Sequence, residues 1–195
     1  MAVGIHPDGS GAHNKHKQPG LAFRQPLLWA LCVSGHQVQD MKMYNYELEH
    51  ICSVKVTLQN PPEVIGPTPD GLRLNIYITG GEVRGPRLNG KVLPVGADWL
   101  TIRSDGVGVL DIRATIETDD GALIYLSYQG LADAGEDGYE KFIEGNPPSP
   151  VPLRGAPRFQ TAHPDYLWLN RIQCHNVGEA DLESWVVGYD LYTVK

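Results

Sequence analysis

The chain has few cysteines and no long apolar run. Its three cysteines, Cys32, Cys52 and Cys174, are odd in number, widely spaced and free of any C-x-x-C pair. This pattern favours small packing residues in a reducing compartment over a disulfide framework. Nothing approaches the roughly 18 consecutive apolar residues of a membrane-spanning helix. The sequence therefore predicts a cytoplasmic protein with no membrane partner.

Positive charge and known catalytic motifs are also scarce. Sixteen Lys and Arg residues face 23 Asp and Glu residues, for a formal net charge of −7. Such a balance argues against nucleic acid as a partner, because counterion release requires clustered basic residues. There is no G-x-S-x-G, no H-E-x-x-H and no phosphate-binding loop. His50, His163 and His175 lack ligand spacing, so we predict no metal site and no cofactor.

Alternating apolar and polar runs, separated by glycine-containing turns, dominate the rest of the chain. Segment 79–130 holds two Asp-Gly pairs, Asp105-Gly106 and Asp120-Gly121, each flanked by alternating residues. An Asp-Gly pair in that setting is a strong hairpin signal, because both central residues accept positive φ. We expect three consecutive antiparallel strands at 99–103, 107–117 and 122–128.

Further strands are expected on both sides of this meander, which brings the total to about ten. The other alternating segments are 47–58, 72–78, 158–162, 168–176 and 182–194. Gly80-Gly81 indicates a bulge or a barrel corner. The long acidic insertion 131–158 holds one short helix, at 137–144, and is typical of a lid or a plain connection.

Residues 1–40 differ from everything that follows. Residues 1–20 are polar, rich in glycine and histidine and without a periodic pattern, and a short apolar run follows at 26–33. We predict a disordered leader or extension there, followed by a single β-barrel domain over 41–195.

Several motifs resemble those of a known family. They are Gly85-Pro86-x-Leu88-x-Gly90, Gly96-Ala97-Asp98-Trp99, Leu110-Asp111-x-Arg113 and Tyr166-Leu167-Trp168-Leu169-Asn170-Arg171. With them, residues 48–194 resemble a family of bacterial and fungal single-domain proteins catalogued only as a domain of unknown function. The resemblance implies an all-β fold, a closed antiparallel barrel similar to the lipocalin-like calycins, and no assigned catalytic residues. Val95 and Leu153 depart from the family pattern, and Leu153 puts any inherited substrate in doubt.

Polar residues within the apolar strands are the candidates for chemistry. A two-residue turn at Asp105-Gly106 places Asp111 and Arg113 on the inward face. A two-residue turn at Asp120-Gly121 pairs Arg113 with Tyr128. We therefore predict Arg113, Asp111 and Tyr128 as catalytic residues inside the barrel, with a barrel-closing salt bridge as the structural alternative.

A second set of residues is expected to contact a substrate. It consists of Arg103, Trp99, Tyr125, Trp168 and Arg171. By contrast, Asp98 reads as a cap for the turn at 94–97, and the aspartates of the two Asp-Gly pairs read as turn formers.

These features favour a cofactor-free isomerase, cyclase or lyase that acts on a hydrophobic phenolic or polyketide-like molecule inside the barrel. Without a metal or a nucleophile, the available chemistry is proton transfer with oxyanion stabilisation, as in closure of a chalcone to a flavanone. The alternatives are a carrier of small hydrophobic molecules without turnover and an adaptor protein whose apparent pocket is only core. We favour the enzyme, because a carrier has less use for an internal Asp–Arg pair. The oligomeric state, homo-oligomer included, stays open.

Overall fold

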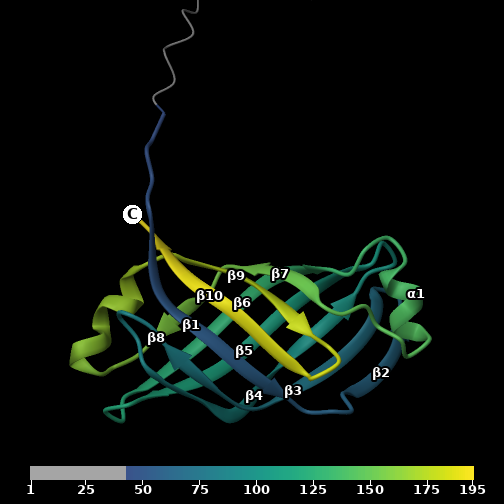
Figure 1. Ribbon diagram of the computed structural model, residues 1–195, viewed down its shortest axis with the longest axis horizontal. Coiled ribbons are helices and arrows are strands. Elements are labelled where there is room, and N and C mark those ends of the chain that lie inside the picture. The colour runs from purple at the N-terminus through teal and green to yellow at the C-terminus, as the bar shows by residue number, and fades with distance from the viewer. Residues whose placement is uncertain (1–42) are drawn as a thin grey trace, which may run out of the picture. The chain divides into compact units, whose positions relative to one another are not determined.

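The structure is a computed structural model that describes residues 43–195, so the predicted leader lies outside the described residues. Ten strands and two short helices follow one another in that part of the chain (Figure 1). They are β1 (Leu48–Leu58), β2 (Glu63–Thr68), β3 (Gly71–Arg84), β4 (Gly90–Ile102), β5 (Val107–Thr118), β6 (Leu123–Asp133), α1 (Gly138–Ile143), β7 (Val151–Gly155), β8 (Arg158–Gln160), the 3₁₀ helix η1 (Pro164–Arg171), β9 (Cys174–Asp181) and β10 (Val186–Val194).

The strands form one closed antiparallel sheet. Its order is β1-β10-β9-β7-β6-β5-β4-β3, and the pairing of β1 with β3 closes the circle. The remaining two strands are additions to this eight-strand barrel: β2 pairs with β3, and β8 pairs with β6. The expected all-β closed barrel is confirmed. Neither helical segment among residues 43–195 has the length and apolar character needed to cross a membrane.

Both Asp-Gly hairpins carry three-residue loops rather than the expected two-residue loops. The N–H groups of Gly106 and Gly121 donate to the carbonyls of Arg103 and Thr118. Each glycine has positive φ, 81° and 87° respectively, as in a type I turn followed by a left-handed residue. The extra loop residue shifts each pairing by one position, so the predicted inward and outward faces of 107–117 are exchanged.

Glycines at two other positions allow the barrel wall to bend. The β3–β4 register shifts between Tyr77 and Gly81, which confirms the corner expected at the glycine pair. A Cβ on Gly81 would lie 2.3 Å from the carbonyl oxygen of Lys55. Gly96 has a φ of 98°, and the β4–β5 register shifts just before it. Such bulges re-aim the side chains that follow them.

The region between β7 and β10 differs from the sequence prediction. Residues 168–176 were expected to form a strand, but the chain is a 3₁₀ helix as far as Arg171, and β9 begins at Cys174. The helix is favoured by Pro164 in its first turn and by His163, whose ring nitrogen accepts from the N–H of Asp165. The expected strand 182–194 starts only at Val186, and β2 and β7 were missed because both contain proline.

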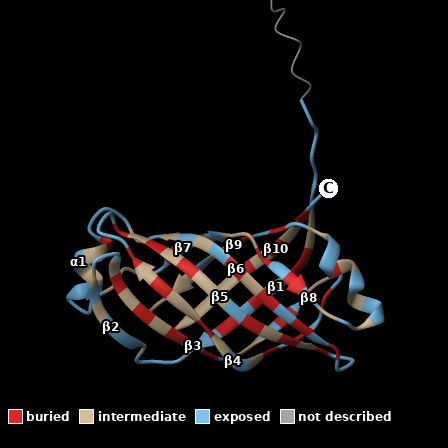
Figure 2. Ribbon diagram, turned by 180° about the vertical axis from the view of Figure 1, so that it is seen from behind, coloured by how far each residue is buried: buried red, intermediate tan, exposed pale blue. Residues whose placement is uncertain are grey.

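The core fills one half of the barrel, toward η1. Figure 2 shows buried and less buried residues alternating along the strands, as a two-residue period requires. The fully buried side chains of this half include Ile51, Leu88, Ile116, Ile124 and Leu169. The other half, toward α1, encloses open space.

Candidate functional site

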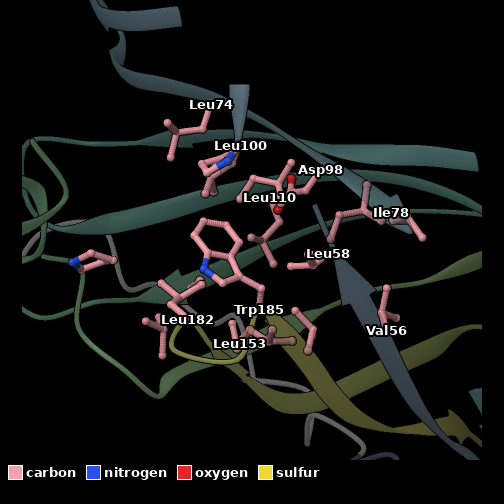
Figure 3. A pocket seen from close by; sticks show the side chains of 18 of the residues that line it. Val56, Leu58, Leu74, Ile78, Asp98, Leu100, Leu110, Leu153, Leu182 and Trp185 are labelled. Carbon is pink, nitrogen blue, oxygen red and sulfur yellow. The ribbon is translucent and has the colours of Figure 1, made fainter. Parts of the chain in front are cut away.

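A cavity of about 290 Å³ occupies the half of the barrel near α1. Figure 3 shows side chains from strands far apart in sequence pointing into it. Of the 26 lining residues, 22 are aliphatic side chains, prolines, a glycine or a phenylalanine, and the remaining four carry polar atoms. Those four are Asp98, Tyr128, Trp185 and Tyr189. A mostly apolar pocket with few convergent polar groups is the usual pattern of a small-molecule site.

Asp98 is the single carboxylic acid among the described residues that line the cavity. It follows the bulge before Gly96 and lies opposite Ile112 of β5, on the inward face. Its Oδ1 accepts from the backbone N–H of Asp111 at 3.0 Å. The β4–β5 pairing is interrupted between Asp98 and Thr101. At this interruption the Asp98 carboxylate accepts a hydrogen bond from the backbone N–H of Asp111. One oxygen is thereby held to the wall.

The surroundings of Asp98 favour its neutral form. Burial raises the pKa of Asp98 from 3.8 to about 7, and the negative charge of Asp111 acts in the same direction. The Asp111 N–H and the positive charge of Arg73 oppose the rise. Asp98 is half-buried and lines the cavity, and Figure 3 shows its side chain among the apolar side chains of the wall. A carboxyl with a pKa near neutrality can both accept and return a proton.

Tyr128 lies in the same row of the sheet as Asp98. Ile112 pairs with Asp98 on one side and with Tyr128 on the other, so the three residues stand on three neighbouring strands. With strands about 4.8 Å apart, the Cα atoms of Asp98 and Tyr128 are about 10 Å apart. Burial raises the pKa of Tyr128 well above 10. Its hydroxyl therefore remains a hydrogen-bond donor at neutral pH.

Tyr189 extends this polar row onto β10. Its ring meets the ring of Tyr128 edge-on, with centroids 6.3 Å apart. Beside them the buried amide of Asn176 has no hydrogen-bond partner of normal geometry among the described residues. Tyr128 and Tyr189 are thus two neighbouring phenols in the lining of the cavity, on strands other than that of Asp98.

The mouth of the cavity lies toward α1 and the β9–β10 turn. Phe142 and Pro147, from α1 and the loop after it, line one side, and Trp185 lines the other. Trp185 has a φ of 57°, the only positive φ of a non-glycine residue among those described. Its carbonyl accepts from the N–H of Leu58, which holds the turn against β1. An aromatic side chain held in a disfavoured backbone conformation at a pocket mouth points to a functional constraint.

Asp111 and Arg113 do not line the cavity, which corrects the prediction. Both lie on the outer face of β5, where Arg113 Nη1 and Asp111 Oδ1 are 3.2 Å apart. The side chains are 47% and 36% exposed, so this is a surface ion pair. The reason is the extra residue in the Asp105-Gly106 loop, which turns Leu110 and Ile112 inward in their place. Of the predicted catalytic set, only Tyr128 is inside.

The predicted substrate-binding residues also lie outside the cavity. Trp99 packs under the guanidinium of Arg113, 5.1 Å from its ring centroid. Arg103 pairs with Asp105 at a hairpin end, and Trp168 of η1 lies 4.0 Å below the guanidinium of Arg87. The remaining two, Tyr125 and Arg171, line a separate hollow on the outer surface.

Sequence reasoning missed Asp98, Tyr189 and Trp185. A signal for Asp98 was present, since it alternates with Leu100 and Ile102, both of which are buried. The interpretation as a turn cap concealed it.

Among residues 43–195, no group of three or more His, Cys, Asp and Glu side chains is arranged to hold a metal ion. Cys52 and Cys174 are free, and burial raises their pKa values to about 12 and about 11.

Comparison with known proteins places these features in a family. The family model described as "Protein of unknown function (DUF3237)" matches residues 46–194. The chain belongs to this family. A UPF0311 protein of Rhodopseudomonas palustris is 42% identical over 101 residues, which are 51% of this chain and 66% of that protein.

Solved structures share the fold. A beta-barrel like protein from Acinetobacter baumannii matches with a TM-score of 0.67 and 34% identity, over 80% of this chain and 99% of that one. A protein from Penicillium herquei, described as an enzyme, matches with a TM-score of 0.58 and 21% identity, over 79% of this chain and 98% of that one. The latter similarity shows the fold alone.

Proposed function

We propose that this protein is a cofactor-independent enzyme, an isomerase, cyclase or lyase, that transfers protons on a small hydrophobic molecule held inside the barrel. The observation that carries the proposal is Asp98, a single carboxyl on the wall of an apolar cavity with a pKa of about 7. Carboxyls tuned toward neutrality in apolar clefts are typical of acid–base catalysts. The Penicillium herquei protein that is described as an enzyme has the same fold, although fold alone does not settle function.

The proposed step begins with the Asp98 carboxylate, which removes an acidic proton from the bound molecule. The electron pair left behind moves to a carbonyl oxygen if a carbon lost the proton, or stays on the oxygen if a phenol lost it. The hydroxyl of Tyr128 donates to that oxygen, and the protonated Asp98 returns its proton to the rearranged product. In this step Asp98 transfers the proton, the part that the sequence suggested for Tyr128, and Tyr128 holds the oxyanion, the part suggested for Arg113.

The cavity suits a compact, mainly apolar substrate, and we propose a phenolic or polyketide-like molecule. Aliphatic walls suit the hydrocarbon part, while Tyr128, Tyr189 and Trp185 supply donors at one side. A volume of about 290 Å³ is near the lower end of the usual range for ligand pockets. Leu153, which departs from the family pattern, lines this cavity, so the preferred substrate is expected to vary between relatives.

The test uses 5-nitrobenzisoxazole, a small aromatic probe that any well-placed base can open. The base takes the ring C–H proton, the C–H electrons form a nitrile, the N–O bond breaks, and a coloured phenolate leaves. We expect turnover by the full chain to rise with pH through about 7, as Asp98 ionises. Asp98→Asn should reduce the rate by about 100-fold or more, while Asp111→Asn on the outer face should leave it within about twofold.

Equal rates for the natural protein and Asp98→Asn would overturn the proposal. A pH–rate profile whose midpoint lies near pH 4 instead of pH 7 would also overturn it. A second probe, 2′-hydroxychalcone, tests the substrate class, because its closure to flavanone requires only proton transfer and oxyanion stabilisation.

The alternative function is a carrier of small hydrophobic molecules. The almost wholly apolar wall favours it, since such a wall binds without chemistry. Saturable binding of both probes without turnover, unchanged in Asp98→Asn, would favour the carrier. The cytoplasmic location stays a proposal, supported by two free and buried cysteines.

A further inference from the structure

A hollow on the outside of the barrel, separate from the cavity, collects unpaired positive charge. Its volume is about 990 Å³, and it shares no lining residue with the cavity. It lies where β8 approaches η1 and the start of β9, at the opposite end of the barrel from α1 (Figure 1). β8 pairs with β6 but with no strand on its other side, so the wall is interrupted there. The hollow lies over that interruption.

The arginines in this hollow differ from the others in the described part of the chain. Six of the eight described arginines use their guanidinium in a hydrogen bond or ion pair with the protein: Arg73, Arg84, Arg87, Arg103, Arg113 and Arg154. The side chains of Arg158 and Arg171 make no hydrogen bond or ion pair with any described residue, and both line the hollow. In a chain of net charge −7, unpaired arginines gathered in one depression are unexpected.

The rest of the lining adds donors and no negative charge. Among the described residues that line the hollow there is no Asp or Glu. Gln160 and Gln173 bring amides, and Tyr125 brings a hydroxyl on a side chain that is 38% exposed. Arg158 and Gln160 are exposed while Phe159 between them is buried, so β8 sends its polar side chains outward into the hollow.

The floor of the hollow is fixed in place. The Asn170 amide donates to the Thr161 carbonyl and accepts from the Thr161 N–H, both at 2.9 Å. This reciprocal pair ties η1 to the end of β8. Leu169 packs underneath with 1% exposure. The two arginines are therefore carried by elements that are anchored to each other.

We propose that this hollow binds an oxyanion, a phosphate or carboxylate group carried by a small ligand, between Arg158 and Arg171. The planar guanidinium offers a fork of N–H donors that matches both groups. The absence of acidic lining residues leaves the arginines free to pair with a ligand rather than with the protein. This site does not depend on the function of the cavity.

The test titrates inorganic phosphate and, separately, acetate into the full chain at constant ionic strength, with calorimetry and arginine side-chain NMR as readouts. We expect saturable binding of at least one anion, with shifts at the Nε–H signals of Arg158 and Arg171. Saturation by phosphate alone indicates a phosphate-bearing ligand, and saturation by acetate alone indicates a carboxylate. Saturation by neither overturns the proposal.

Variants separate a built site from general charge attraction. Arg158→Gln and Arg171→Gln should each weaken anion binding by about tenfold or more. Arg103→Gln removes the same charge at a hairpin end outside the hollow and should leave binding unchanged. Equal weakening by all three variants would mean that net charge alone draws the anion, and would overturn the site. Asp98→Asn should bind the anion normally, which keeps this result distinct from that of the cavity.

Discussion

The two halves of the barrel are built from the same strands but are filled differently. Toward η1, buried side chains such as Ile116, Leu126 and Phe159 pack together and leave no cavity that a water molecule could enter. Toward α1, the same strands surround an open cavity of about 290 Å³. On β5, Ile116 packs in the filled half, and Ile112, four residues earlier on the same face, borders the cavity.

Side-chain size accounts for much of the difference. The cavity wall contains Ala114, Ala132 and Ala180 where larger residues would reach the centre. An eight-stranded barrel is just wide enough for its side chains to fill it or for one small ligand to bind. One half of this barrel takes the first option and the other takes the second. The filled half therefore carries stability, and the open half is available for a ligand.

The largest expected effect comes from a matched pair of substitutions on β5. Ile116→Ala should lower the free energy of unfolding by about 3 kcal/mol, because it removes buried methyl groups and leaves a new void. Ile112→Ala should cost about half as much, since its side chain already borders empty space. Urea unfolding of both variants at one pH measures the difference. Equal losses would mean that the two halves are packed alike.

A smaller effect, with a distinct pH dependence, is expected from Asp98→Asn. The folded-state pKa of Asp98, about 7, lies above its ordinary value of 3.8, so the folded protein binds more protons than the unfolded chain between those values. The resulting destabilisation is absent below about pH 4, grows as the pH rises, and is complete above about pH 7. A pKa shift of about three units corresponds to a loss of at most about 4 kcal/mol in the free energy of unfolding. Because Asp98 is only partly buried and borders the cavity, we expect a loss of about 2 kcal/mol.

Asn keeps the acceptor for the Asp111 N–H and lacks the charge. The variant should therefore be more stable than the natural sequence at pH 8 by about 2 kcal/mol and equally stable near pH 4. Urea unfolding at the two pH values makes the measurement, with Asp111→Asn as the control, whose trend should be much smaller because it removes only a neighbouring charge. A stability difference that does not change with pH would contradict a raised pKa.

The smallest effect concerns the mouth of the open half. Trp185 adopts a φ of 57°, which glycine accepts at little cost and alanine does not. The free energy of unfolding of Trp185→Gly should therefore be about 1 kcal/mol higher than that of Trp185→Ala, although both variants lose the same indole. Urea unfolding of the two variants checks this. An alanine variant as stable as the glycine variant would show that the turn relaxes without the indole.

Much of the fold could be predicted from local sequence. Alternation located the strands 47–58 and 107–117, the glycine pair located a corner, and the short helix near 137–144 was placed correctly. The failures lie where local pattern is ambiguous. Residues 168–176 were predicted as a strand by alternation, yet Pro164 and the His163 cap begin a 3₁₀ helix that runs as far as Arg171. β7 contains Pro152, and proline argues against a strand unless its missing N–H faces no ladder partner.

The candidate site could be predicted only in part, because it depends on which face of each strand turns inward. The sequence by itself determined a closed β-barrel and an apolar lumen, whereas Tyr128 was placed inside through a pairing with Arg113 that the structure replaces by a pairing with Ile112. Only the tertiary structure decided that Asp98 lies inside and that Asp111 and Arg113 lie outside. For Asp111 and Arg113 the physical reason is one extra residue in the Asp105-Gly106 loop. A side-chain period of two converts a one-residue shift in pairing into a complete exchange of faces.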